Sequence, residues 1–485
     1  MSKVKHQQTI SNERSSNRWL ALIFLALAQF LVVLDSSIIN IALPSIGEDL
    51  LLGTDTLSWV ITAFIVPFGG LLLLGGRLAD RFGHRTIFML GVIGFILGSA
   101  LASLSNSIEF LLAARTIQGI SAAFLAPSAL ALVTVLFTEP SERAKALGLW
   151  GIVAGLGSGA GVLLGGILTS MFGWTAIFFI NIPVGVLVVI ALPMLVTKDT
   201  KAQNKKTDVL GAVTVTAGLV SLVTSLTAAN QVHIMTTVTL FVLGIVLLVS
   251  FIFIEKKAKE PLVPFSIFRN PSVVKGNLSM LFIGGAMIGL FFGLSVYMQM
   301  VLEYDALTTG LTQLPLVVAL MLGAGIVPEF MNRVGTERTL VFTLFLFAAG
   351  LVWLSFAPSD ASFVSHLLGP TIVLGAGAGG ALVSSTALAV SGVAKREEGL
   401  AGGLMNSSQQ IGGAFGITIL VIVSAMRTDA LTSANFDMAD ALTGGFSWVF
   451  RGAAIFAIIS ALLVIFVQRK KVNTTVKQGS LNQSR

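Results

Sequence analysis

The sequence has 485 residues, contains no cysteine and is only 11% charged. The missing cysteines exclude disulfide bonds and thiolate metal sites. The sequence also lacks a Ser/His/Asp set and a phosphate-binding Walker loop, so we expect neither an enzyme nor ATP-driven chemistry. No metal site and no cofactor are predicted either, since no cluster of His, Asp and Glu is apparent and the histidines are scattered at His6, His84, His233 and His366.

The shortage of charge indicates which solvent the chain faces. A soluble protein is about one quarter charged because its surface contacts water. This chain is 55% apolar, with a mean hydropathy of +0.91, so lipid must cover most of its surface. A helix needs roughly 20 apolar residues to cross the ~30 Å hydrocarbon core, and fourteen such runs are present. They lie near 19–43, 57–75, 86–104, 109–135, 146–168, 174–196, 209–229, 234–254, 273–301, 308–330, 339–357, 364–390, 403–425 and 446–468.

These runs favour an all-α integral membrane protein. A transmembrane barrel would show alternating segments of about ten residues, which are not apparent. The net charge of +7 comes from Lys and Arg in alternate loops and in both tails. By the positive-inside rule this predicts cytoplasmic termini, and it makes the basic charge a topology signal rather than a nucleic-acid footprint.

Two long basic loops, 198–208 and 255–271, divide the helices into groups of six, two and six. Residues 76–85 and 328–338 occupy equivalent places in the outer groups and keep their Arg and Gly positions, which indicates related halves. Transporters use such halves for alternating access around a midplane site. The predicted segments are a polar, unstructured tail at 1–18, a six-helix bundle at 19–196, two central helices with their loops at 197–272, a second bundle at 273–468 and a tail at 469–485.

Several motifs carry a family resemblance. They lie at 34–44 (LDSSIINIALP), 76–85 (GRLADRFGHR), 111–123, 157–166 (GSGAGVLLGG), 174–185 and 399–416. In this order they resemble the fourteen-helix drug:proton antiporter family of the major facilitator superfamily. Val162 replaces the usual proline of the fifth-span motif, and Thr175 replaces the usual arginine.

The resemblance implies multidrug efflux and antibiotic resistance, with the proton gradient as the energy source. It also implies a multi-pass protein of the plasma membrane that works as a single copy among membrane lipids. Its expected partners are lipophilic small molecules and protons, with no nucleic acid.

Asp35 is the residue most suggestive of coupling. An ionised carboxylate within a span costs at least ~2.5 kcal/mol unless it faces a cavity or a partner. It lies sixteen residues past Trp19, which predicts a place in the outer half of the first span. Such a group can bind a proton or a cationic compound, and that competition would produce antiport. Alternatively, Asp35 anchors the outer interface or caps a helix.

Arg115 is the basic residue deepest within a predicted span, so it must be paired or hydrated. The resemblance implies that it assists proton transfer, while the alternative is a structural hydrogen-bonding hub near Gln118. Asn40 is either a polar neighbour of Asp35 or a residue that stabilises helix–helix packing. Aromatic, Met and amide side chains suit varied lipophilic cations, although most such residues are simply core or lipid-facing. The candidate substrate contacts are Asp35, Asn40, Trp59, Gln118, Phe292, Tyr297, Met298, Gln299, Asn406 and Gln410.

Two further groups are predicted to act in the conformational cycle. In the 76–85 loop the residues are Gly76, Asp80, Arg81, Gly83 and Arg85; glycines permit a tight turn, and Asp80 can face a helix N-terminus or a basic partner. Its plainer interpretation is a basic loop that fixes topology. In the fifth span the small-residue face allows close helix approach, and coupling is implied only by the resemblance. That face contains Gly157, Gly161, Gly165 and Gly166.

Other functions remain open at this point. A lipid or lipid-linked exporter and an uptake symporter are alternatives within transport. A membrane sensor would need a soluble signalling domain, and a channel would need a selectivity filter; neither is apparent.

Overall fold

The computed structural model describes residues 2–196, 208–228, 234–258, 261–391, 393 and 398–466. Within these ranges every regular element is helical. The first group comprises α1 (Ser2–Asp49), α2 (Thr54–Phe82), α3 (His84–Ser103), α4 (Ile108–Leu136), α5 (Pro140–Phe172), α6 (Ala176–Phe179) and α7 (Asn181–Leu195). Two helices follow, α8 (Val209–Ala228) and α9 (Ile234–Lys257), and then the short η1 (Phe265–Arg269). The last group comprises α10 (Pro271–Met300), α11 (Ala306–Val334), α12 (Thr336–Leu354), η2 (Phe363–Leu367), α13 (Leu368–Val390), α14 (Glu398–Ser433) and α15 (Met438–Phe466).

The helices agree with the fourteen predicted spans. Twelve of them are long and apolar enough to cross a membrane, and two shorter apolar helices, Leu156–Phe172 and Leu210–Ser225, account for the remainder. Helices α6 and α7 together form one span, as do η2 and α13. With an even number of crossings, α1 begins and α15 ends on the same side of the bundle. We call this the terminal side and the opposite one the far side.

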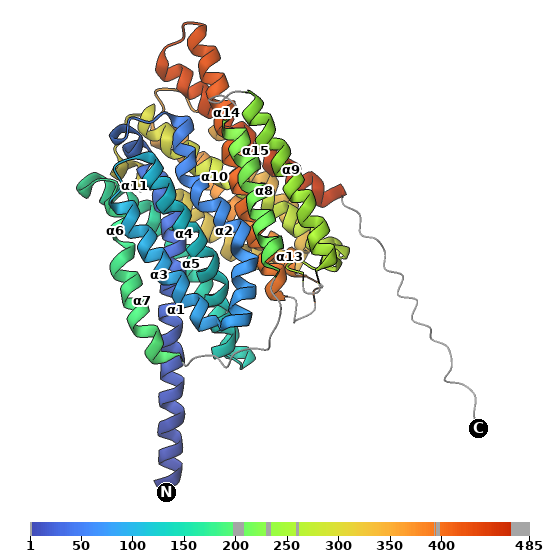
Figure 1. Ribbon diagram of the computed structural model, residues 1–485. Helices are drawn as coiled ribbons and strands as arrows, with labels where there is room; N and C mark the ends of the chain where they lie inside the picture. The colour runs from blue at the N-terminus through green and yellow to red at the C-terminus, as the bar shows by residue number, and fades with distance from the viewer. Residues whose placement is uncertain are drawn as a thin grey trace.

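Several helices extend beyond the predicted spans. The polar residues 2–18 extend α1 instead of forming an unstructured tail, because a helix nucleated by an apolar span adds further residues at little cost. At its other end α1 continues through Pro44 to Asp49, six residues beyond the expected stop. Helices α14 and α15 likewise outrun their spans and form the hairpin that projects at the far side in Figure 1. The C-terminal tail lies outside the described residues.

The two outer groups pack in the same pattern. The pairs α1·α5, α2·α4 and α3·α4 in the first half correspond to α10·α14, α11·α13 and α12·α13 in the second. The turn that follows α2 and the one that follows α11 also match, with Gly83 at φ 99° and Gly335 at φ 89°. In each turn the glycine N–H donates to a carbonyl four residues earlier, on Ala79 and Met331 respectively. A side chain would be strained at such φ values, so both halves need glycine there.

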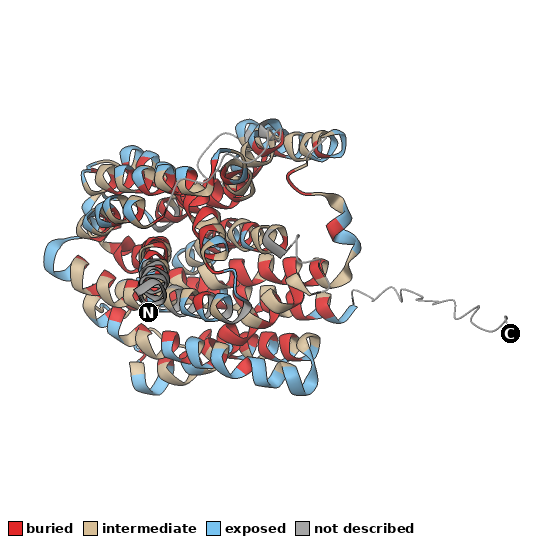
Figure 2. Cartoon of the chain, turned by 90° about the horizontal axis from the view of Figure 1, so that it is seen from below, coloured by how far each residue is buried: buried red, intermediate tan, exposed pale blue. Residues whose placement is uncertain are grey.

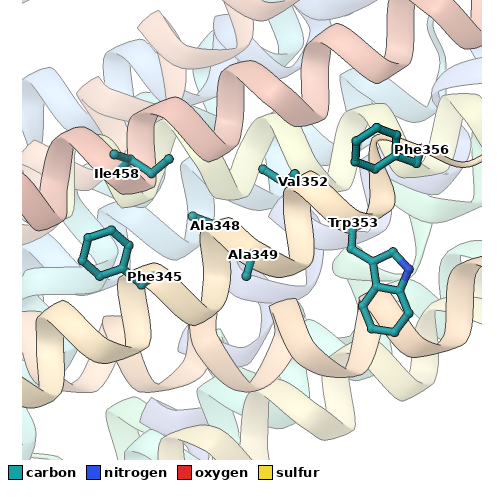
Figure 3. Close-up of a pocket in the computed structure, with 7 residues that line it drawn as sticks. All are labelled: Phe345, Ala348, Ala349, Val352, Trp353, Phe356 and Ile458. Carbon is teal, nitrogen blue, oxygen red and sulfur yellow. The ribbon is translucent and has the colours of Figure 1, made fainter.

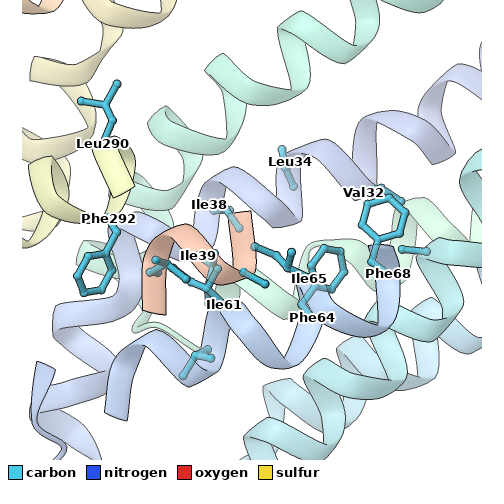
Figure 4. Packing of buried hydrophobic residues seen from close by; sticks show 14 of the residues in the cluster. Val32, Leu34, Ile38, Ile39, Ile61, Phe64, Ile65, Phe68, Leu290 and Phe292 are labelled. Atoms are coloured by element: carbon cyan, nitrogen blue, oxygen red, sulfur yellow. The ribbon is translucent and has the colours of Figure 1, made fainter. Parts of the chain in front are cut away.

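The halves meet along two seams, α5 with α11 and α2 with α14. Buried residues concentrate along the helix faces turned inward, while exposed residues lie on the outside (Figure 2). Figure 4 shows part of this core, where Ile38 and Ile39 of α1, Ile61 and Phe64 of α2 and Phe292 of α10 lie close together. Helices α8 and α9 pack on each other, and α8 also contacts α2 and α14. Figure 1 shows this pair at one edge of the bundle.

Candidate functional site

A hydrogen-bonded network lies sealed inside the first half. Helix α1 supplies Asp35, α4 supplies Arg115 and Gln118, and α7 supplies Asn181; all four side chains are buried. Asp35 Oδ2 accepts from Arg115 Nη1 at 2.5 Å. Asp35 Oδ1 accepts from Gln118 Nε2 at 3.1 Å and from Asn181 Nδ2 at 3.0 Å. The carboxylate therefore has charged or amide donors on both oxygens.

The arginine is held as firmly as the aspartate. Gln118 Oε1 accepts from Arg115 Nη1 at 2.8 Å, and the carbonyl of Val60 accepts from Nε at 3.2 Å. The guanidinium also lies 4.6 Å from the ring centre of Phe64 and 5.7 Å from that of Phe178. A buried charge without a partner is strongly destabilising, so each member of this pair needs the other. This geometry is compatible with both interpretations of Arg115, a residue that assists proton transfer and a structural hydrogen-bonding hub, since Arg115 is both an ion-pair partner and a hydrogen-bonding centre.

Asp35 lies close to the middle of the first span. The span runs from Arg18 to Asp49, so Asp35 is 17 residues after its start and 14 before its end. It is nearer the midpoint than the predicted span implies, because the helix continues past Pro44. Every hydrogen-bond partner of the Asp35 side chain belongs to the first half, and its exposure is 0%. The carboxylate thus faces the interior of one bundle in this conformation.

Asn40 lies about one turn further along α1, where the two halves meet. Its backbone carbonyl accepts from Ser295 Oγ at 2.7 Å, and the carbonyl of Ile41 accepts from Gln299 Nε2 at 3.0 Å. The Asn40 side chain donates to the carbonyl of Ser36 at 3.1 Å, while its Oδ1 is buried without a partner. These bonds join α1 to α10, so the first helix links the Asp35 network to the second half.

Three aromatic or Met candidates are part of the packed core. Phe292, Tyr297 and Met298 are all buried on α10. Tyr297 donates its hydroxyl hydrogen to the carbonyl of Pro358 at 2.6 Å, and Thr312 donates to the sulfur of Met298 at 3.4 Å. In this conformation these three residues are therefore part of the packed core.

The remaining contact candidates lie in varied surroundings. Trp59 and Gln410 are half-buried, and Asn406 is exposed. Gln410 lies at the α2–α14 seam, where a Cβ built on Gly69 would come 2.7 Å from its own Cβ. A role in substrate binding stays a prediction for every candidate.

The structure adds polar residues that the sequence analysis missed. Asn181 belongs to the quoted 174–185 motif but was not picked out, although an amide inside an apolar span was a usable signal. Gln313 of α11 is fully buried and neither its Nε2 nor its Oε1 has a partner; the hydroxyl of Thr309, one turn away, is also unpaired. Gln313 falls between Gly310 and Val317, which pack against α5, so its amide lies beside the α5–α11 seam.

The four glycines of α5 pack closely against neighbouring helices, but on two faces and not on the single face expected. A Cβ on Gly157 or Gly161 would crowd α1 at Phe30 and Ser37, and one on Gly165 would crowd α1 at Ile38. Gly166 faces the other way, where a Cβ would come 2.6 Å from the carbonyl of Ala306 on α11. These four glycines therefore lie on two contact surfaces, one within the first half and one across the seam.

The 76–85 loop forms the turn between α2 and α3 on the terminal side. Asp80 lies 3.8 Å from His84 Nε2 at the start of α3, so it has both a basic neighbour and a helix N-terminus nearby. Arg81 stacks over Phe82, and a Cβ built on Gly76 would make an ordinary van der Waals contact with Pro127 at 3.8 Å. Arg77 donates to the carbonyl of Pro261 at 2.7 Å, which ties α2 to the segment leading into α10. Arg85 also makes an interaction with another group.

Two similar six-helix halves, spans throughout and a buried polar network define a multi-pass membrane transporter. The chain belongs to the Major Facilitator Superfamily, whose sequence profile matches residues 25–417.

Its relatives include named resistance and export proteins. It is 38% identical to the puromycin resistance protein pur8 of Streptomyces alboniger, over 85% of this chain and 83% of that one. It is 34% identical to the cephamycin export protein CmcT of Amycolatopsis lactamdurans, over 94% of each chain. The solved structure of the POT family transporter PepTSo superposes with a TM-score of 0.68 at 15% identity, covering 92% of this chain and 97% of that one. This last likeness concerns the fold alone.

Proposed function

We propose that this protein exports lipophilic toxic compounds, antibiotics among them, in exchange for protons that move inward. The observation that carries the coupling is the Asp35–Arg115 ion pair buried in the first half. A buried ion pair adds little to stability compared with apolar packing, so its presence favours a functional role. Relatives named for puromycin resistance and cephamycin export support drug efflux as the task.

In this proposal Asp35 is the proton site. Neutralising the carboxylate would leave the guanidinium of Arg115 without its counter-charge in a buried setting, which is a high-energy state. Helices α1, α4 and α7 would then have to rearrange until Arg115 finds water or another acceptor. Because Asn40 and Ile41 follow Asp35 by five and six residues on α1, about 8–9 Å along the axis, the rearrangement reaches their bonds with α10 directly.

We propose that the substrate binds along the seams between the halves and not on Asp35 itself. Donors already occupy both oxygens of that carboxylate, so a cationic compound would have to displace Arg115. Asn40, Gln313 and Thr309 instead have unpaired polar atoms near the seams, which become available when the halves separate. Exchange of one proton inward for one monovalent cation outward moves no net charge, so the pH gradient alone drives it; for an uncharged substrate the inward proton also gains ~2.3 kcal/mol per 100 mV of membrane potential.

The proposal places the protein in the plasma membrane with both termini in the cytoplasm. It acts as a monomer with no bound cofactor, and the proton gradient is its energy source. In this orientation the terminal side faces the cytoplasm and the far side faces outward.

Reconstituted liposomes provide the test. Full-length protein is inserted, a pH gradient is imposed, and movement of a fluorescent lipophilic cation is followed beside an uncharged analogue of matched size. We expect transport against the dye gradient only while the pH gradient persists, and its collapse on adding a protonophore. Transport that ignores the protonophore would remove proton coupling, and the absence of any dye movement over a chemically diverse panel would remove drug export.

A further inference from the structure

Among Arg115, Lys275 and Arg451, three basic side chains of the helical spans, only Arg451 lacks a carboxylate partner within the described residues. Arg115 pairs with Asp35, and Lys275 pairs with Glu337 at 3.2 Å. Arg451 of α15 has no carboxylate within 4.0 Å among the described residues. A cation in a span without a counter-charge is costly, so an anion from outside the chain is the natural partner.

Arg451 lies at the depth of the far membrane interface. Its Nε donates to Ser355 Oγ at 3.3 Å, and Ser355 directly follows the last residue of α12. Helix α12 has 19 residues, about 28 Å at 1.5 Å per residue, which matches the hydrocarbon thickness. Trp353 and Trp448 are 51% and 41% exposed at this level, as expected for an interfacial aromatic belt.

An apolar groove leads from this point toward the membrane centre. Its volume is about 550 Å³; α12 lines it from Phe345 to Trp353, Phe356 lines it just beyond the helix, and Ile458 of α15 lies on the opposite wall. Figure 3 shows these side chains along the two helices, with the small Ala348 and Ala349 between the larger ones. Phe356 follows Phe345 by eleven residues, which corresponds to roughly 16 Å, the scale of a lipid acyl chain.

The charge and the groove meet at Phe356. The Arg451 guanidinium carbon lies 5.6 Å from the centre of the Phe356 ring and 5.9 Å from that of Trp448. Phe356 also lines the groove, so the cation is positioned at its far-side mouth. A guanidinium has five N–H donors in a fork that matches phosphate oxygens, and only Nε is engaged by a protein hydrogen bond among those described here.

We propose that this groove binds one phospholipid of the far-side leaflet, with an anionic headgroup on Arg451 and an acyl chain between α12 and α15. We favour a membrane lipid because the groove combines a cation at the membrane interface, Arg451, with an apolar channel that extends toward the membrane centre. Charge complementarity selects an anionic over a zwitterionic lipid. This site is separate from the seams proposed for the exported compound and does not depend on them.

Native mass spectrometry of the purified full-length protein tests the headgroup part. Phosphatidylglycerol and phosphatidylcholine with identical chains are titrated in turn. We expect about tenfold tighter binding of phosphatidylglycerol at one site, a preference that Arg451→Gln abolishes and Arg451→Lys largely keeps. Arg427→Gln is the matched control, since Arg427 is an exposed far-side arginine outside the groove. An unchanged preference in Arg451→Gln, or equal loss in Arg427→Gln, would overturn the proposal.

Quenching of tryptophan fluorescence tests the acyl-chain part. Phosphatidylglycerol with brominated chains should quench Trp353, and Trp353→Phe should remove that component of the quenching. Ala349→Phe, which fills an exposed position in the groove, should weaken the quenching severalfold while Arg451 stays intact. If the soluble headgroup alone, glycerophosphoglycerol, competes as well as the intact lipid, or if Ala349→Phe has no effect, the groove does not bind the acyl chain.

Discussion

The two halves share a packing scheme but differ in what their interiors contain. Both use the same helix pairs, and both turn between their second and third helices through a glycine at positive φ. The first half encloses the Asp35–Arg115 pair at 0% and 1% exposure. In the described part of the second half, the ion pair with a buried member is Lys275–Glu337, which lies near helix ends with Glu337 29% exposed. Inside α11 the buried polar groups are neutral, as at Gln313.

This difference indicates that the fold does not need buried charge. The second half packs the same way with its ion pair near helix ends and no fully buried pair among its described residues, so the sealed ion pair of the first half is better explained by function than by stability. We therefore expect substitutions in the first half to affect proton coupling, and those in the second half to affect stability or substrate handling.

The largest effect is expected from separating the ion pair. Asp35→Asn leaves Arg115 charged and unpaired, so thermal unfolding in detergent should show a loss of about 3–5 kcal/mol together with loss of proton-driven efflux. Arg115→Gln should be similarly inactive. The double substitution Asp35→Asn with Arg115→Gln should regain most of the stability but none of the coupled transport. Additive losses in the double variant would mean that the two charges do not stabilise each other.

Asn181 tests the same network through a neutral member. Asn181→Ala removes a hydrogen bond to a buried carboxylate, a loss of about 1.5–3 kcal/mol, and should shift the pH dependence of efflux. Asn277→Ala in the second half is the matched control. Asn277 donates to the carbonyl of Val273 and accepts from Ser408, so only neutral bonds are lost and the pH profile should not move. Equal shifts of the profile in both variants would contradict the contrast between the halves.

Gln313→Leu should raise the unfolding stability, whereas the substitutions above lower it. It removes a buried amide whose two polar atoms are unpaired, and each such group costs about 1–3 kcal/mol, so unfolding stability should rise. The closed seam becomes more favourable as well, and transport should slow. The chain has no cysteine, so spin labels on cysteines introduced at the exposed Met171 and Leu311 can report opening of the α5–α11 seam. A variant that opens more often would contradict this prediction.

The smallest effect is expected at helix caps. Asp305 accepts from the backbone N–H of Thr308, and hydrogen bonds from Thr308 lower the pKa of Asp305. Its contribution is therefore present above the unfolded pKa, near 4, and is lost as the pH falls through the lower folded value. Asp305→Ala should cost about 1 kcal/mol or less at pH 7 and nothing in strong acid. Ser107, which caps α4 in the first half, does not titrate there, so Ser107→Ala should cost a similar amount at every pH.

Much of the fold could be predicted because one constraint dominates it. Lipid requires long apolar helices, so each span can be recognised as an apolar run in the sequence. The basic loops show how the helices are divided into groups. The helix ends were less predictable. Pro44 appeared to stop the first span, yet α1 continues through it, because neighbouring helices can stabilise a proline inside a membrane helix. The polar residues 2–18 carried no signal that distinguishes a helical extension from a tail.

The site was predictable in its charges but not in its geometry. Asp35 and Arg115 were conspicuous because charges inside spans are rare, and Gln118 was recognised as their neighbour. That the two charges bond to each other depends on how α1 packs beside α4, which no local pattern encodes. Gln313 was missed for a related reason: a single amide in an apolar run becomes notable only once its surroundings provide no partner.

The position of α8 has a consequence for how compounds reach the protein from the bilayer. Helix α8 lies against both α2 and α14, with Thr216 beside Gly70 and Ala212 in an apolar cluster with Leu74 and Ala401. It thereby screens one of the two lateral joints from lipid, whereas α5 and α11 have no such shield among the described helices. Among the described helices, α8 therefore covers one seam and leaves the α5–α11 seam facing lipid, so under the proposed function a compound dissolved in the membrane would enter from the α5–α11 side.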